Sequence, residues 1–229
     1  MGKMKSQPFW KNWLSYLWEI HIESLPSELN PHLYVSLKNG RYQLCTANAV
    51  YSYDELYNNF GDLFPLLKMD QLPGNHVLVL GFGLGSVPLI LEKQFGPVYE
   101  FTGIELDESV IELASKYTLP RLNSVVHLIR SDAGQFIGIS EEQFDLIAID
   151  IFLDDLIPKV FRTEGFLKNV KSRLTENGLV IMNTLAATEA DKKASDRFFN
   201  NVFVKVFPDG RAVSIPGNQM LISSSSYLK

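Results

Sequence analysis

The fold of this chain is decided by the stretch Val77-Leu78-Val79-Leu80-Gly81-Phe82-Gly83-Leu84-Gly85, together with Ile104-Glu105-Leu106-Asp107 further on. The apolar run before the glycines is typical of a strand buried on both faces of a parallel sheet. Gly81, Gly83 and Gly85 allow a sharp turn and let a ligand approach the backbone closely. A helix is expected over 86–95 and a second strand over 99–105. This order of strand, glycine turn, helix and strand predicts a nucleoside-binding α/β fold.

The glycine spacing and Glu105 narrow the class of nucleoside ligand that we expect. Dinucleotide enzymes use G-x-G-x-x-G, whereas this chain has G-x-G-x-G, the form associated with S-adenosylmethionine (AdoMet) enzymes. Glu105 ends the second strand, where its carboxylate can accept hydrogen bonds from both ribose hydroxyls. We therefore expect an AdoMet-type cofactor, with Gly81, Gly83, Gly85 and Glu105 as binding residues.

From residue 77 onward, predicted strands and helices alternate, which indicates a doubly wound, mostly parallel sheet with ligands at the carboxyl ends of its strands. Strands are expected over residues 77–80, 99–105, 125–130, 144–150, 178–183, 202–206 and 219–223. Helices are expected over residues 86–95, 108–117, 133–138, 162–174 and 189–199. No helix separates the last two strands, so we expect them to form an antiparallel hairpin.

The region before the sheet has a different pattern. Aromatic and aliphatic residues over 9–24 predict one helix with a wide apolar face, typical of a packing surface or a homodimer surface. Lys38-Asn39-Gly40 predicts a hairpin turn between strands over 33–37 and 41–46. A further helix is expected over 53–67. We place the boundary at the Pro-Gly break after Leu72, which gives an N-terminal helix-and-hairpin region, 1–72, and an AdoMet-binding α/β domain, 73–229.

Four further acids lie at or just after the ends of the second, third and fourth expected strands. Asp132 can accept a hydrogen bond from the adenine amino group, with Ala133 leaving room beside the ring; capping the next helix is the equal alternative. Asp107 is expected to cap a helix. Asp150 ends the fourth strand, where it faces the transferred group, and is the best candidate for positioning or deprotonating a nucleophile. Asp154 follows in a loop.

Composition argues against several classes of protein. The formal charge of −5 and the absence of a basic run argue against nucleic-acid binding and would suit a cationic substrate. The single cysteine and four scattered histidines predict no disulfide and no metal site. Residues 1–8 are too polar for a signal peptide, and no apolar run reaches transmembrane length. We therefore expect a cytoplasmic protein with no membrane partner.

The chain resembles the spermidine synthases, which transfer an aminopropyl group from decarboxylated AdoMet to putrescine and belong to the class I AdoMet-dependent methyltransferase superfamily. The likeness covers residues 33–223. Residues 104–111 resemble the family motif E-I-D-x-x-V-I, residues 131–133 resemble its G-D-A, and Tyr57 lies in a segment that resembles its Y-H-E. The resemblance implies cofactor binding at Glu105 and Asp132, and catalysis by Asp150, Asp154 and Tyr57.

Three departures affect acidic positions of the family. Leu84 replaces the acid of the G-G-G-D-G-G loop, Asn59 replaces the glutamate of Y-H-E, and Leu153 replaces the second acid of D-S-S-D-P unless Asp154 compensates. A polyammonium substrate needs several carboxylates, because an unpaired buried ammonium costs several kcal/mol. The missing acids therefore argue against putrescine.

These departures place methyl transfer to an unknown small acceptor slightly ahead of aminopropyl transfer. Methyl transfer needs mainly in-line positioning of a nucleophile. Apolar Phe82, Leu84, Phe152 and Leu153 would suit a less charged acceptor. A non-catalytic nucleoside-binding or interaction protein on the same fold is the remaining alternative.

Overall fold

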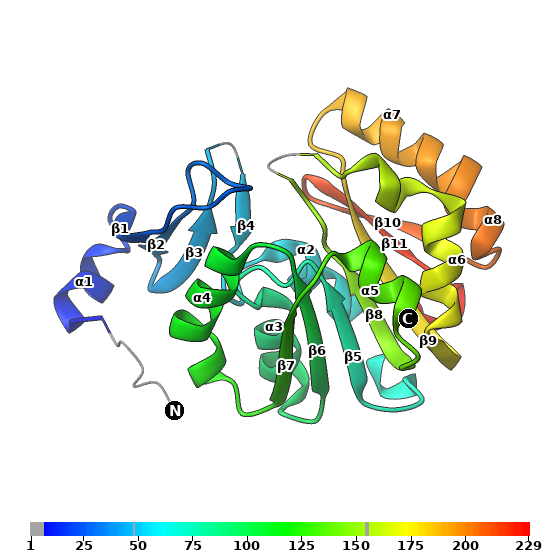
Figure 1. Ribbon diagram of the computed structural model, residues 1–229, viewed down its shortest axis with the longest axis horizontal. Coiled ribbons are helices and arrows are strands. Elements are labelled where there is room, and N and C mark those ends of the chain that lie inside the picture. Colours follow the sequence, from blue (N-terminus) through cyan, green and yellow to red (C-terminus); the bar gives the residue numbers. More distant parts are fainter. Residues whose placement is uncertain (1–6, 48, 154–155) are drawn as a thin grey trace.

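The computed structural model describes residues 7–47, 49–153 and 156–229, which form a small antiparallel sheet beside a larger, mostly parallel one (Figure 1). The small sheet has the order β1-β2-β3-β4. Its strands are β1 (Ile20–Ser24), β2 (Tyr34–Lys38), β3 (Arg41–Cys45) and β4 (Val50–Ser52). Asn39 and Gly40 turn the chain between β2 and β3 with φ of 51° and 71°, as the Asn-Gly pair predicts.

The large sheet has the order β10-β11-β9-β8-β5-β6-β7, which confirms the predicted α/β fold. Its strands are β5 (His76–Leu80), β6 (Glu100–Glu105), β7 (Val125–Arg130), β8 (Phe144–Ile149), β9 (Leu174–Leu185), β10 (Arg211–Ile215) and β11 (Asn218–Ile222). The pairs from β9 to β7 are parallel, and β11 runs antiparallel to both β9 and β10. The carboxyl ends of β5, β6 and β8 therefore meet at one edge, beside the small sheet (Figure 1).

Helices cover both faces of the large sheet (Figure 1). One apolar core lies between the sheet and α2 (Asn58–Leu63), α3 (Ser86–Phe95) and α4 (Glu108–Tyr117). The second lies under α5 (Ala133–Ile139), α6 (Glu164–Ser172), α7 (Glu189–Phe198) and α8 (Val204–Val206). Short 3-10 helices span Phe64–Leu66, Met69–Gln71, Leu119–Arg121, Lys159–Arg162 and Ser225–Tyr227. Apart from the exposed His76 at the start of β5, both β5 and β8 are buried on both faces, which explains their apolar runs, interrupted by Asp145 near the start of β8.

The glycine turn after β5 is shaped by close backbone packing. Gly81, Gly83 and Gly85 have φ of 83°, 53° and 88°, a region that side chains with a Cβ rarely adopt. A Cβ on Gly81 would also collide with the backbone carbonyl of Asp150. The turn therefore brings the end of β5 directly against the end of β8.

The expected helix over 9–24 is wrong beyond its first turns. The helix α1 (Phe9–Leu14) is short and buries none of its residues, so no packing extends it. The chain then becomes β1, which pairs with β2. The helix expected over 53–67 begins only at Asn58, because residues 53 and 55 form a bridge instead.

The strand expected over 202–206 is also wrong. The helix α7 continues as a π-helix, Phe199–Phe203, and then as α8. Phe198, Phe203 and Val206 are buried against the second core, and their helical spacing outweighs the β propensity of the valines. The terminal hairpin does form, with β10 in place of the expected strand. Among the described residues, no helix has the length and apolar character needed to cross a membrane.

Candidate functional site

A cavity of about 830 Å³ opens where the ends of β5, β6, β8 and β9 meet the small sheet. This volume lies in the range of small-molecule sites. Of the residues predicted for the site, Tyr57, Gly81, Gly83, Glu105, Asp132, Ala133 and Asp150 line it. Gly85 is not among the lining residues and instead precedes α3. Asp154 lies outside the described residues.

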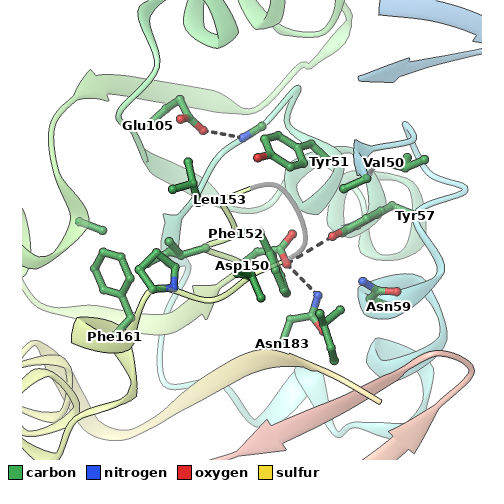
Figure 2. Close-up of a pocket in the computed structure, with 18 of the residues that line it drawn as sticks. Val50, Tyr51, Tyr57, Asn59, Glu105, Asp150, Phe152, Leu153, Phe161 and Asn183 are labelled. Atoms are coloured by element: carbon green, nitrogen blue, oxygen red, sulfur yellow. Dashed lines mark hydrogen bonds between the residues drawn. The ribbon is translucent and has the colours of Figure 1, made fainter. Parts of the chain in front are cut away.

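Asp150 is held by two neutral donors (Figure 2). The Tyr57 hydroxyl donates to its Oδ1 at 3.3 Å, and the Asn183 side-chain amide donates to the same oxygen at 2.8 Å. In the part of the chain that the structure describes, nothing donates to Oδ2. Burial raises the pKa of the Asp150 carboxyl to about 6, although both hydrogen bonds lower it. The result is an acid that can take up and release a proton near neutral pH.

Tyr57 reaches Asp150 from just before α2. Burial, and then the nearby charge of Asp150, raise the pKa of the Tyr57 phenol well above its ordinary value. The phenol therefore stays protonated and acts as a hydrogen-bond donor.

Glu105 is built into the turn that follows β6. Its Oε1 accepts the backbone N–H groups of Leu106 and Asp107, at 2.9 and 3.1 Å, and its Oε2 accepts that of Gly83 at 3.1 Å (Figure 2). Burial raises the pKa of this carboxyl, and the three N–H groups oppose that shift. The carboxylate thus fixes the glycine turn and still presents Oε2 beside it.

Asp107 ties the N-terminal region to this end of the cavity. Its Oδ1 accepts the backbone N–H of Ser109, so the predicted helix cap is confirmed. Its Oδ2 accepts from the Ser27 hydroxyl and the Asn30 amide, at 2.5 and 2.8 Å. The Tyr51 hydroxyl in turn donates to Asn30 at 2.9 Å. Residues far apart in the chain thereby close one side of the cavity.

Asp132 takes the capping role that was one of its two alternatives. Its Oδ1 accepts the backbone N–H of Gln135 at 2.8 Å, at the start of α5. Both Asp132 and Ala133 still line the cavity, so the adenine contact stays a prediction.

The apolar residues expected to suit an acceptor divide into two groups. Phe82 and Leu84 are buried in the core, where Phe82 packs on Gly103, and neither lines the cavity; that expectation is wrong for them. Phe152 and Leu153 do line it. The glycine turn determines this outcome, because it directs both apolar side chains into the protein.

Asn183 is a site residue that the sequence reasoning did not identify. It lies in β9, donates to Asp150, and accepts from the Asn218 amide at 2.8 Å. A signal for it existed, because Asn183 is the polar last residue of the strand expected over 178–183, as Asp150 is of the strand before.

The charged side chains on the described cavity wall are all acidic. The acids on it are Glu105, Asp107, Asp132, Asp150 and Asp191, and no Lys, Arg or His lines it among the described residues. Four of these acids accept at least one backbone N–H. Asp150 is the exception, because only side chains donate to it.

Comparison with known proteins agrees with the fold. A family model described as the spermine/spermidine synthase domain matches residues 64–216, about two thirds of the chain. The chain therefore belongs to the spermine/spermidine synthase family.

Individual relatives include both aminopropyl and methyl transferases. A polyamine aminopropyltransferase of Vibrio vulnificus is 30% identical over 118 residues, which cover 49% of this chain and 38% of that protein. This chain thus spans well under half of that relative's length.

Solved structures with the same fold include a spermidine synthase in complex with the transition-state analogue AdoDATO (TM-score 0.68, 18% identity, 89% of this chain and 72% of that one). Human methyltransferase-like protein 13 in complex with SAH matches with a TM-score of 0.59 at 25% identity, over 74% of this chain and 82% of that one. The family match and the curated relatives support the aminopropyl alternative better than the expected lean toward methyl transfer.

Proposed function

We propose that this protein transfers an alkyl group from the sulfonium of an AdoMet-type nucleoside to the nitrogen of an amine, and that the group is aminopropyl. The observation that carries the proposal is Asp150, a half-buried acid whose Oδ1 is held by Tyr57 and Asn183, with no donor to its Oδ2 among the described residues. An acid so placed is suited to orienting an amine and accepting its proton.

The nucleoside is assigned to the edge formed by β5 and β6. Glu105 would accept hydrogen bonds from the ribose hydroxyls through Oε2, and the turn at Gly81 and Gly83 would leave room for the ligand beside the backbone. Asp132 and Ala133 would contact the adenine. The volume of the cavity and the half-buried carboxylate at Glu105 fit such a group.

Asp150 would act on the acceptor. The amine lone pair forms a bond to the carbon attached to sulfur, the carbon–sulfur bond breaks, and its electrons remain on sulfur as a neutral thioether. The acceptor arrives as an ammonium, and the proton that it must lose before its lone pair can attack passes to Asp150 Oδ2 and then to solvent. Tyr57 and Asn183 hold Oδ1 and thereby aim the other oxygen at the amine.

The decarboxylated donor suits a wall of this charge. AdoMet carries a carboxylate that would meet acids and no basic side chain among the described lining residues, whereas decarboxylated AdoMet lacks it. The family match points the same way. The amine acceptor, a cation in water, suits the same wall.

Methyl transfer is the second candidate, and Leu84 favours it. The ammonium of an aminopropyl tail would find no carboxylate from the glycine turn, since Leu84 is apolar and buried. Methyl transfer does not need that partner. The likeness to methyltransferase-like protein 13 supports this candidate as well.

The test presents AdoMet and decarboxylated AdoMet separately, with a panel of amines, and follows methylthioadenosine and S-adenosylhomocysteine by mass spectrometry. The proposal expects amine-dependent methylthioadenosine from the decarboxylated donor. S-adenosylhomocysteine alone would establish the methyl alternative. Nucleoside binding without any turnover would establish the non-catalytic one.

A further inference from the structure

The hairpin of β10 and β11 brings an amide side chain to the cavity beside Asn183. Asn218 is the first residue of β11 and lines the cavity, and its amide donates to Asn183 Oδ1 at 2.8 Å. The pairing of β11 with β9 places Met220 directly opposite Asn183, so Asn218 stands diagonally across from Asn183 on the same face of the sheet. The strand register therefore holds the two amides within reach of each other.

Both amides stand where an apolar face of the sheet reaches the cavity. Side chains alternate along a strand, so Asn183 shares its face with Ile181. Asn218 shares its face with Met220 in the same way, and both of these hydrophobic residues belong to the apolar core that α2 covers. Asn183 is 1% exposed, and a polar side chain so buried needs a partner for each end of its amide. Asn218 provides the partner for the carbonyl, and Asp150 provides the partner for the NH2 group.

The direction of the Asn183 amide decides what Asp150 meets. An asparagine side chain carries a donor and an acceptor, which exchange places when the amide rotates by half a turn. In the direction observed, the NH2 group donates to Asp150 Oδ1, to which the Tyr57 hydroxyl also donates (Figure 2). In the reversed direction, the carbonyl oxygen would face Oδ1 and could not donate to it. Because Asn218 donates to that carbonyl, it favours the direction observed.

We propose that Asn218 is a positioning residue of the site, which orients the Asn183 amide so that this amide donates to Asp150. Asn218 acts through Asn183 and needs no contact with the substrate. The inference rests on the proposed function for the part that Asp150 plays in the reaction, whereas the orientation of the amide is tested without turnover.

A titration of the Asp150 carboxyl provides this test. With carbon-13-labelled aspartate, NMR follows the carboxyl between pH 4 and pH 8 in the wild type, Asn218→Leu, Asn183→Leu and the double variant, and the spectrum of Asp150→Asn assigns the signal. Each single variant removes or misdirects a donor to the ionised carboxylate, so the midpoint should rise, by about 0.5 pH unit in Asn218→Leu. Because Asn218 acts through Asn183, the double variant should titrate like Asn183→Leu alone. The other acids of the cavity wall are the same in all four proteins and do not affect the comparison.

Gln219→Leu is the matched control in the same hairpin. Gln219 follows Asn218 in β11, and its amide donates to Asp196 at 2.9 Å, on the other face of the strand. The control should leave the midpoint of Asp150 unchanged, and an equal rise would assign the effect to a disturbed hairpin and overturn the inference. If Asn218→Leu does not fold, Asn218→Met, with a more adaptable side chain and no donor, takes its place.

The remaining outcomes separate this inference from the proposed function. An unmoved midpoint in Asn218→Leu, or shifts that add in the double variant, would overturn the inference whatever the protein catalyses. With an amine acceptor in hand, Asn218→Leu should lower kcat by about tenfold and leave the affinity for methylthioadenosine unchanged; loss of that affinity would indicate a collapsed cavity and count against positioning. If the titrations of Asn218 and Asn183 variants are coupled but no amine is alkylated, the orientation is supported and the proposed function fails.

Discussion

The substitution Asp150→Asn tests whether the ionised Asp150 carboxylate lowers the free energy of unfolding. Burial raises its pKa from the ordinary 3.8 to about 6 in the folded protein. Between these values the folded state binds more protons than the unfolded state, so the free energy of unfolding falls as the pH rises through this window. The whole difference corresponds to about 3 kcal/mol, at 1.36 kcal/mol for each pH unit. Asparagine does not ionise and escapes this cost.

We therefore expect the stability of Asp150→Asn relative to wild type to increase by about 2–2.5 kcal/mol between pH 4 and pH 7, most of the whole difference, and then to level off. Urea unfolding of both proteins at several pH values measures it. A constant offset from altered hydrogen bonds does not matter, because only the pH dependence is compared.

Asp209 offers a control of opposite sign. It is exposed, and hydrogen bonds from Ser225 and Ser224 lower the pKa of its carboxyl. Asp209→Asn should lose stability at neutral pH, and this loss should vanish as the pH falls through the pKa of the folded state. A pH-independent difference for Asp150→Asn, beside the expected behaviour of Asp209→Asn, would refute the buried acid and with it the proposed base.

Three further predictions follow from the same contacts. Tyr57→Phe removes a donor that lowers the Asp150 pKa, so the acidic inflection in kcat/KM should rise by about 0.5–1 pH unit; an unmoved inflection contradicts this role. Glu105→Ala should weaken methylthioadenosine binding by about 1.5–3 kcal/mol in calorimetry, and unchanged affinity in a folded variant would exclude the ribose contact. Arg121→Met leaves the buried Asp54, which Arg121 contacts at 2.8 Å, without its cationic partner. This variant should lower the free energy of unfolding in urea by about 3–5 kcal/mol. Adding Asp54→Asn should recover much of that loss, and no recovery would contradict the pairing.

The sequence predicted the large sheet well because its signals are local. An apolar run over β5, a glycine turn and an acid at the end of β6 lie within thirty residues and need no distant partner. The errors fall where distant contacts decide. The segment 202–206 has strand-forming valines, but the sheet packs against it from elsewhere in the chain and keeps it helical. The segment 20–24 becomes a strand because β2 is available to pair with it.

The residues at the strand ends of the site could each be predicted from the sequence, but the hydrogen bonds between them could not. Gly81, Glu105 and Asp150 follow from the rule that ligands lie at the carboxyl ends of parallel strands. Tyr57 and Asn183 both donate to one oxygen of Asp150, although they lie 93 and 33 positions away from it in the sequence. No local sequence pattern predicts contacts over such separations. The inward direction of Leu84 likewise follows from the geometry of the turn and not from its composition.

Asp54, which is buried, and Asp150, which is half-buried, show the difference between an acid that the fold requires and an acid that the site requires. Asp54 is 1% exposed and meets the Arg121 guanidinium and the backbone N–H of Tyr42, so its charge is compensated where it lies. Asp150 has no cationic partner among the described residues and meets only an amide and a phenol. An acid that served packing alone would be replaced at a gain in stability by a neutral residue of the same shape. Its uncompensated charge is instead suited to a cation that arrives with the substrate, which is the role proposed for the amine.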